Sequence, residues 1–163
     1  APGVLHGQAN RRPAVTANIT INGDESFFTA TPPGAGTGIY IMSGNTLSAP
    51  NGSVLLTGTG GAATASRTAL GMQIDFGTTI TAADTISVLG SVANATQLGL
   101  VVNGILGGTG STAEIDLTGD RVAIGGSIVT SRLVSIAPLA ALIDVDLGST
   151  GKTAAGTVEL SAT

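Results

Sequence analysis

Apolar and polar residues alternate along many short stretches of this chain. Val15, Ala17, Ile19 and Ile21 fall on one face at a period of two, the pattern of a half-buried β-strand. Asn22-Gly23-Asp24 follows and predicts a turn. Similar short runs predict strands at residues 38–42, 53–57, 70–76, 78–81, 85–89, 98–102, 113–117, 122–124 and 156–160. No amphipathic helix of ordinary length is predicted up to residue 130.

One stretch, residues 133–147, permits two interpretations. Pro138 is followed by Leu-Ala-Ala-Leu-Ile, which would suit a short helix with the proline in its first turn. The alternative, which we favour, is two more strands with a turn at Pro138.

The strongest signal is internal repetition. Residues 68–75 (TALGMQID) recur as residues 96–103 (TQLGLVVN), and residues 36–42 (GTGIYIM) are a looser copy. The glycine shared by these copies stands at positions 38, 71 and 99, at intervals of 33 and 28. A second strand closes each unit, and its final glycine stands at 58, 90 and 119, at intervals of 32 and 29. Two independent landmarks therefore keep nearly the same spacing.

A unit of about 30 residues with several short strands and no helix predicts one coil of a β-solenoid. We therefore predict an all-β fold, a parallel β-helix of about five coils, with residues 15–163 as a single domain after a tail at residues 1–14. At the usual strand spacing the stack would be on the order of 25 Å long, with two open edges that need a cap, an assembly partner or further coils. A β-sandwich is the alternative all-β fold. It is the less favoured one because a sandwich would not require the matched sequence units that this chain contains.

The repeats resemble those of filamentous haemagglutinin-type and autotransporter adhesins, large bacterial exoproteins with parallel β-helix shafts. The matching residues are 38–47 (GIYIMSGNTL) and 54–61 (VLLTGTGG), with later echoes up to about residue 130. The Asn-Pro-Asn-Gly signature of the secretion domain is missing, so the resemblance implies a piece of the shaft. It also implies export as an unfolded chain, surface display and adhesion, and it carries over no catalytic residue.

Composition narrows the classes of function further. Charged residues make up 10% of the 163 residues, the net charge is −4, and there is no cysteine. Six scattered basic residues cannot neutralise a run of phosphates, so nucleic acid is not an expected partner. Cysteine-ligated zinc and a cysteine nucleophile are excluded. No stretch approaches the roughly 18 apolar residues of a membrane helix, so no membrane span is expected.

Residues 148–153 (GSTGKT) end like a phosphate-binding loop. The G-x-x-x-x-G-K-[ST] pattern requires glycine at position 146, where Asp146 stands, and its carboxylate would repel phosphate. A glycine-serine turn is the preferred interpretation.

Two pairs of carboxylates, Glu114 with Asp116 and Asp144 with Asp146, are spaced to share one face of a strand. Such pairs are typical of carbohydrate-active β-helix enzymes, and with Asp120 they suggest calcium ligands. Arg121 and Arg132 would be available to hold an acidic sugar. The preferred interpretation is that these acids form the solvated side of strands whose apolar residues point inward.

The remaining candidates are weaker. His6, the only histidine, lies in the predicted tail, where nothing in the sequence orients it as a catalytic base. Thr29-Ala30-Thr31, Thr57-Gly58-Thr59 and Thr79-Ile80-Thr81 resemble the threonine ladders of ice-binding solenoids, but their spacings of 28 and 22 are uneven.

We therefore expect a non-enzymatic structural or adhesive segment of a secreted or cell-surface bacterial protein. No catalytic residue, cofactor or metal ligand is assigned, and the expected partners are host or matrix glycans and proteins, or copies of the chain itself. The alternatives are a self-assembling surface-layer or fibre subunit and a polysaccharide lyase-like β-helix enzyme. Replacing Asp116 and Asp120 by Asn would distinguish the lyase.

Overall fold

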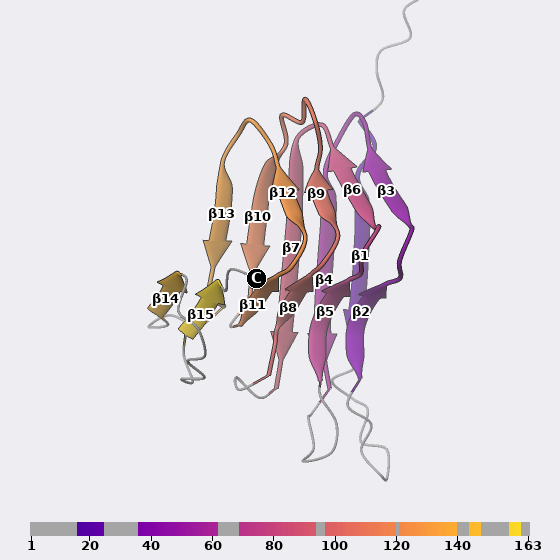
Figure 1. Cartoon of the computed structure of the whole chain (residues 1–163). Coiled ribbons are helices and arrows are strands. Elements are labelled where there is room, and N and C mark those ends of the chain that lie inside the picture. The colour runs from indigo at the N-terminus through magenta and orange to yellow at the C-terminus, as the bar shows by residue number, and fades with distance from the viewer. Residues whose placement is uncertain are drawn as a thin grey trace, which may run out of the picture.

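The computed structural model describes residues 16–24, 36–61, 69–93, 97–119 and 121–139, together with the backbone of two strands at 144–147 and 157–160. The predicted tail, residues 1–14, lies outside the described residues. All the described elements are strands, and the first twelve wind into successive coils of three strands each (Figure 1). The predicted parallel β-helix of about five coils is confirmed.

Three parallel sheets form the sides of the solenoid. Sheet A, in order, contains β1 (Ile19–Asp24), β4 (Val54–Gly60), β7 (Thr85–Val92), β10 (Glu114–Thr118) and β13 (Val134–Ala137). Sheet B contains β2 (Thr37–Ile41), β5 (Leu70–Ile74), β8 (Leu100–Val102) and β11 (Val122–Ile124). Sheet C contains β3 (Thr46–Ala49), β6 (Thr79–Ala82), β9 (Ile105–Gly107) and β12 (Ser127–Val129). Two further strands, β14 (Asp144–Leu147) and β15 (Thr157–Leu160), pair in parallel with each other.

The register between coils confirms the repeats that the sequence predicts. In sheet A, Val54 pairs with Ile86 and Ile86 pairs with Ile115. In sheet B, Ile39 pairs with Met72 and Met72 with Leu100, which places the glycines at 38, 71 and 99 at equivalent positions. Both sequence landmarks therefore mark true coil positions.

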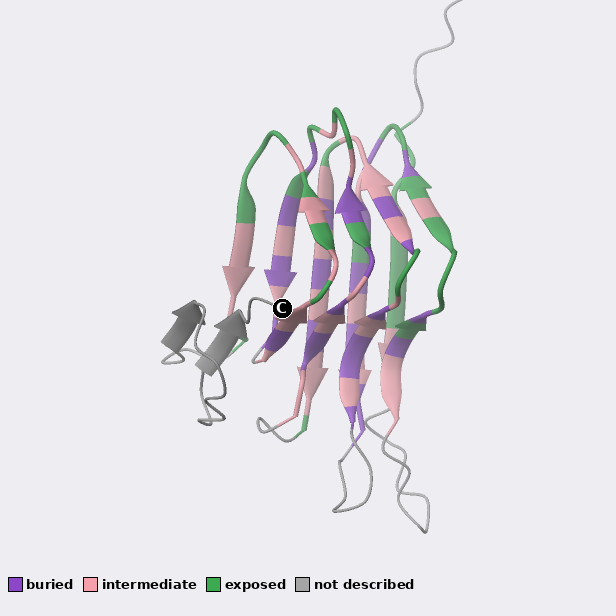
Figure 2. Ribbon diagram, viewed as in Figure 1, coloured by how far each residue is buried: buried purple, intermediate pink, exposed green. Residues whose placement is uncertain are grey.

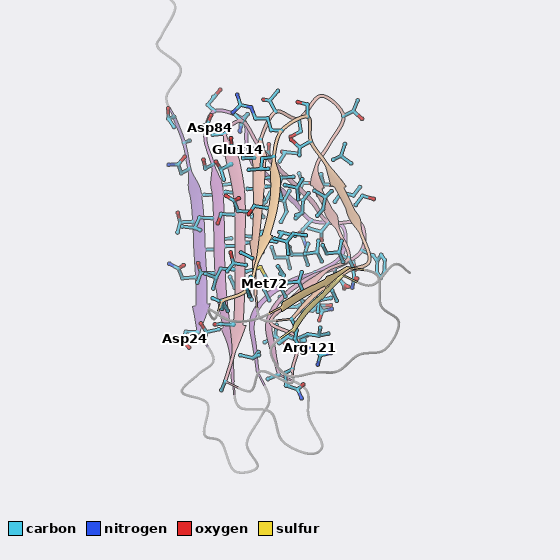
Figure 3. The ribbon with its side chains drawn as sticks, turned by 90° about the vertical axis from the view of Figure 1, so that its left-hand side faces the viewer. Asp24, Met72, Asp84, Glu114 and Arg121 are labelled. Carbon is cyan, nitrogen blue, oxygen red and sulfur yellow. The ribbon has the colours of Figure 1, made fainter. Side chains whose placement is uncertain are left out.

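Alternation of side chains builds the core, as the banding of buried residues in Figure 2 shows. Every second residue of a strand points inward, where it stacks on the equivalent residue of the next coil. Figure 3 shows these side chains filling the interior, with Met72 labelled among them. The largest fully buried side chains are Leu56, Met72, Ile74, Ile80, Ile86, Leu100, Leu106, Ile115, Leu117, Val54, Val88 and Val102. At roughly 1.5–3 kcal/mol for each buried side chain, this aliphatic column is the main favourable contribution to the stability of the fold.

Glycine is required where the ends of the sheet A strands pass close to sheet B. A Cβ on Gly90 would lie 2.7 Å from the carbonyl carbon of Gly99, and a Cβ on Gly58 would lie 3.0 Å from that of Gly71. These are backbone atoms, which no side-chain rotation can move away. We call this region, Gly58 and Gly90 on sheet A facing Gly71 and Gly99, the glycine seam.

The turn predicted at Asn22-Gly23-Asp24 is wrong, because these residues continue β1. They pair in register with Thr57-Gly58-Thr59 of β4, so Gly23 extends the row of glycines at the seam. The hydrogen bonds of a parallel neighbour outweigh the local preference of Asn-Gly for a turn.

At residues 133–147 the two strands of the favoured interpretation are confirmed, whereas most of the residues of the alternative helix, 140–143, lie outside the described residues. β13 ends at Ala137, directly before Pro138, and β14 begins at Asp144. No helix is present in the described part of this stretch, which omits residues 140–143.

In three coils the sequence pattern did not predict the third strand; these strands are β3, β9 and β12. These strands have only three or four residues, too few for alternation to be recognisable. In the first two coils the turn before the third strand carries a glycine, Gly44 before β3 and Gly77 before β6, with φ values of 77° and 72°. Such left-handed conformations favour glycine.

Candidate functional site

The carboxylates Glu114 and Asp116 lie on the outward face of β10, while Ile115 and Leu117 between and beside them are buried. The prediction that this pair shares one face is confirmed. Asp120 lies outside the described residues, and for Asp144 and Asp146 the structure describes the strand but not the side chains. In the described parts of the chain no three acidic or histidine side chains gather as metal ligands would.

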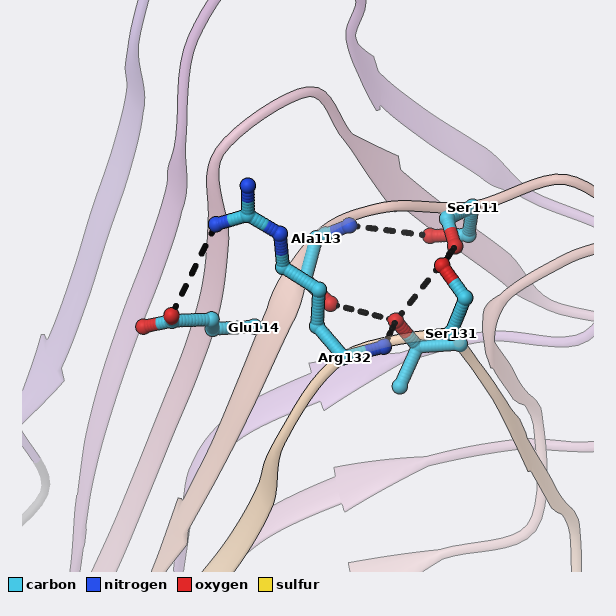
Figure 4. Close-up of polar contacts among 6 residues, drawn as sticks. Ser111, Ala113, Glu114, Ser131 and Arg132 are labelled. Atoms are coloured by element: carbon cyan, nitrogen blue, oxygen red, sulfur yellow. Dashed lines mark hydrogen bonds and ion pairs between the residues drawn. The ribbon is translucent and has the colours of Figure 1, made fainter.

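Arg132 forms an ion pair with Glu114. Its Nη1 lies 3.7 Å from Oε1, and both side chains are about half exposed, at 59% and 48% (Figure 4). An exposed pair at this distance is screened by water and is worth at most about 1 kcal/mol. Arg121, the other candidate for binding an acidic sugar, is at the opposite end of the sheet A strands from Glu114 and Asp84 (Figure 3). The two arginines therefore do not converge on the acidic pair.

Beside this ion pair, hydroxyl groups hold the corner between sheets C and A. The Thr130 hydroxyl donates to the carbonyl of Ala113 at 2.6 Å, and the Ser131 hydroxyl donates to the carbonyl of Ser111 at 3.1 Å. The backbone N–H of Arg132 donates to Thr130 Oγ1 at 3.1 Å. Figure 4 shows these bonds bridging two successive coils. The Thr130 and Ser131 hydroxyls thus hold this corner to the backbone of the preceding coil.

A second polar network surrounds Asp75, at the turn between sheets B and C. Its Oδ2 accepts hydrogen bonds from the Tyr40 hydroxyl at 2.7 Å and the Ser43 hydroxyl at 3.2 Å. The pKa of Asp75 is lowered, mainly by the hydrogen bond from Tyr40. Partial desolvation raises the pKa and so opposes this effect, whereas interactions with Ser43, the Gln73 side chain and the Phe76 backbone lower it further. Through the hydrogen bonds from Tyr40 and Ser43, which belong to the preceding coil, Asp75 is a clamp between coils.

The hydrogen bond between Tyr40 and Asp75 also shifts the pKa of Tyr40, its donor. The bond to Asp75 is the first cause that raises the pKa of Tyr40, followed by desolvation and by the negative charge of Asp75. Tyr40 therefore releases its proton at a higher pH than an unperturbed tyrosine does.

One polar side chain, Thr78, is fully buried among the described residues. Its hydroxyl donates to the carbonyl of Met42 at 2.9 Å, and its own carbonyl accepts from the N–H of Ile105 at 2.8 Å. A buried polar group with all its partners in the backbone is a structural feature rather than an unpaired site.

The Thr-x-Thr triplets do not form one array. Thr57 and Thr59 lie on the outward face of β4 in sheet A, whereas Thr79 and Thr81 lie on β6 in sheet C. Thr81 instead stacks on Ser48 of β3, and its hydroxyl donates to Ser48 Oγ at 2.9 Å. Thr29-Ala30-Thr31, His6 and the loop-like residues 148–153 lie outside the described residues.

Two contacts, the Asp75 clamp and the ion pair of Arg132 with Glu114, were not predicted from the residue pattern. A signal for the first was present, because the register of β2 on β5 places Met42 opposite Asp75 and so brings Tyr40 and Ser43 beside it. The second depends on how the chain turns between β12 and β13, which the sequence pattern does not specify.

The described surface shows no pocket or cleft, and the described residues include no helix with the length and apolarity needed to cross a membrane. No family model, curated protein or solved structure matches the chain.

Proposed function

We propose that this chain is a structural and adhesive segment of a secreted or cell-surface bacterial protein, a stiff rod without catalytic activity. The observation that supports the proposal is the regular stack of coils. The inward positions of β4, β7 and β10 are all apolar or glycine. The polar networks at Asp75 and at Thr130 hold one coil to the next. A rod of this kind places whatever it carries at a fixed distance from its base.

The surface supports the same role. Outward positions on sheet A carry small polar residues such as Thr57, Ser87 and Thr118 beside single apolar ones such as Leu55. A low-charge, hydroxyl-rich surface suits weak, repeated contact with glycans or matrix proteins.

Immunoblotting of cytosolic, cell-surface and secreted fractions tests this proposal. We expect the native product in the surface or secreted fraction. A mass many times 15.8 kDa would identify the chain as part of a long shaft, and a mass near 15.8 kDa would identify a self-sufficient subunit. A product confined to the cytosol would refute the proposal.

The competing enzyme hypothesis is a polysaccharide lyase-like activity using Glu114 and Asp116, with Arg132 close to the first. The assay is release of unsaturated product from polygalacturonate by the purified chain, compared with Asp116→Asn and with Asp75→Asn as a control outside this face. We expect no product from any of the three proteins. Turnover that Asp116→Asn abolishes and Asp75→Asn retains would establish the enzyme instead.

A further inference from the structure

The chain has two methionines, and the structure places them in opposite environments. Met72 of β5 is fully buried in the aliphatic column of the core, as Figure 3 shows. Met42 follows β2 directly, in the turn towards β3, and its side chain is 62% exposed. An oxidant dissolved in water therefore reaches the sulfur of Met42 but not that of Met72.

Met42 belongs to an exposed apolar corner between sheets B and C. Tyr40, two residues earlier on the outward face of β2, is 51% exposed, and Phe76, in the turn after β5, is 63% exposed. The Asp75 clamp holds these two turns together, since its carboxylate accepts hydrogen bonds from the hydroxyls of Tyr40 and Ser43. We call Tyr40, Met42 and Phe76 the apolar corner.

The backbone of Met42, rather than its side chain, holds this turn. Its carbonyl oxygen accepts hydrogen bonds from Asn45 Nδ2 at 2.8 Å and from the Thr78 hydroxyl at 2.9 Å. The preceding residue, Ile41, supplies the buried side chain, and its carbonyl accepts from the N–H of Asp75 at 3.0 Å. A chemical change confined to the Met42 thioether therefore leaves these contacts in place.

We propose that the Met42 thioether is a reversible oxidation site, which takes up one oxygen atom from a peroxide while the fold stays intact. A sulfur lone pair attacks one peroxide oxygen, the O–O bond breaks, and with hydrogen peroxide the other oxygen leaves as water. Sulfur loses two electrons, and the peroxide gains them. A dithiol-dependent reductase reverses the step, since the sulfoxide oxygen then leaves as water and the two thiols become a disulfide.

The sulfoxide changes the surface without changing the core. Oxidation converts a flexible apolar side chain into a polar one, so the apolar corner gains a hydrogen-bond acceptor. At Met72 the same oxygen would be buried among aliphatic side chains, which is unfavourable. The inference goes beyond the proposed spacer role and does not depend on it.

Mass spectrometry of the folded chain in hydrogen peroxide tests the proposal. Trypsin cleaves after Arg67, so Met42 and Met72 fall on different peptides and their oxygen uptake is measured separately. We expect Met42 to be oxidised at least about tenfold faster than Met72, because Met72 reacts only when its coil opens. In guanidinium chloride, which unfolds the chain, the two rates should become similar.

Two leucine variants are matched controls, because exchange of methionine for leucine nearly conserves side-chain volume. Folded Met42→Leu should take up no oxygen under conditions in which the parent takes up one atom. Met72→Leu should take up one atom at the parent rate. If Met72→Leu does not fold, the peptides of the parent still decide the question.

Two further measurements test the intact fold and the reversibility. Thermal unfolding of the chain oxidised at Met42 should give a Tm within about 2 °C of the untreated chain, as for other changes to an exposed side chain. Methionine sulfoxide reductases for both sulfoxide epimers, supplied with a dithiol, should remove the oxygen.

Equal oxidation of Met42 and Met72 in the folded chain, or oxygen uptake by folded Met42→Leu, would overturn the proposal. A larger fall in Tm, or a sulfoxide that the reductases leave in place, would also overturn it. None of these results affects the spacer function, which fractionation tests separately.

Discussion

The glycine seam permits a prediction whose size follows from the structure. Gly90 and Gly119 occupy equivalent positions on neighbouring coils, since Leu89 of β7 pairs with Thr118 of β10. A Cβ on Gly90 would lie 2.7 Å from the Gly99 carbonyl carbon and 3.2 Å from Leu100 Cα, which are both backbone atoms. A Cβ on Gly119 would meet the Gly90 carbonyl oxygen at 3.1 Å and two side-chain atoms at 3.4 Å.

The two substitutions to alanine should therefore differ in cost. Ordinary contact begins near 3.4 Å, and a Cβ on Gly90 would overlap the Gly99 carbonyl oxygen even more closely than the carbonyl carbon, so Gly90→Ala requires the backbone at Gly99 to move by more than about 0.7 Å, whereas Gly119→Ala requires a few tenths of an ångström. Overpacking that displaces backbone costs about 1–3 kcal/mol, and alanine recovers roughly 0.4–1 kcal/mol by restricting the unfolded chain. We expect Gly90→Ala to lose about 2 kcal/mol and Gly119→Ala to change stability by less than about 1 kcal/mol.

Thermal unfolding followed by circular dichroism measures the difference. For a chain of this size, about 2 kcal/mol corresponds to a fall in Tm of about 4–8 °C. Gly119→Ala should stay within about 4 °C of the parent. Equal Tm values for the two variants, or a Gly90→Ala protein as stable as the parent, would refute the close backbone approach at the seam.

Other predictions concern the core and the Asp75 clamp. Ile86→Ala, at a fully buried position in the central coil, should lower the free energy of unfolding measured in urea by about 2–5 kcal/mol. Leu55→Ala on the surface should lower it by well under about 1 kcal/mol. Similar losses for the two variants would contradict the inward register of sheet A. Tyr40 is the only tyrosine, so phenolate absorbance should report its pKa above about 10, and Asp75→Asn should bring it back towards 10. The pKa of Asp75 is lowered in the folded state, so its contribution to stability is present above about pH 3.9 and is lost as the pH falls through the lower folded pKa. In Tyr40→Phe the pKa of the Asp75 carboxyl, measured by NMR, should rise. An unchanged pKa would show that the Tyr40 bond is absent in solution.

Much of this fold was predictable because a solenoid repeats its constraints in every coil. Glycine recurs at positions 58, 90 and 119 because a Cβ at each of them would come close to the backbone of a neighbouring strand or coil. One repeat alone would not have indicated this requirement. The same repetition predicted which residues of β10 point inward. Local rules failed where a neighbouring strand dominates, as at Asn22-Gly23-Asp24, whose pairing with β4 replaces the expected turn.

The candidate site was harder to predict than the fold. The shared face of Glu114 and Asp116 follows from strand alternation alone. The partners of these residues do not, because Arg132 reaches Glu114 only through the course of the chain between β12 and β13. Similarly, the Asp75 clamp depends on how the turn after β5 stacks on the turn after β2. The sequence predicts this contact only if the register of the two strands is extended past their ends into the turns.

The coils are equivalent building units of a rod, and deleting one whole coil tests this equivalence. Removing residues 54–85 joins Ser53 to Ile86, which takes the register position of Val54. We predict a protein with a cooperative thermal transition and an unchanged β-sheet spectrum, shorter by about one strand spacing of roughly 4.8 Å in solution scattering. Removing residues 54–69 instead deletes β4 alone, leaves β5 and β6 without a sheet A strand to complete their coil, and should prevent cooperative folding. Loss of cooperative unfolding in both deletions would contradict the equivalence of the coils.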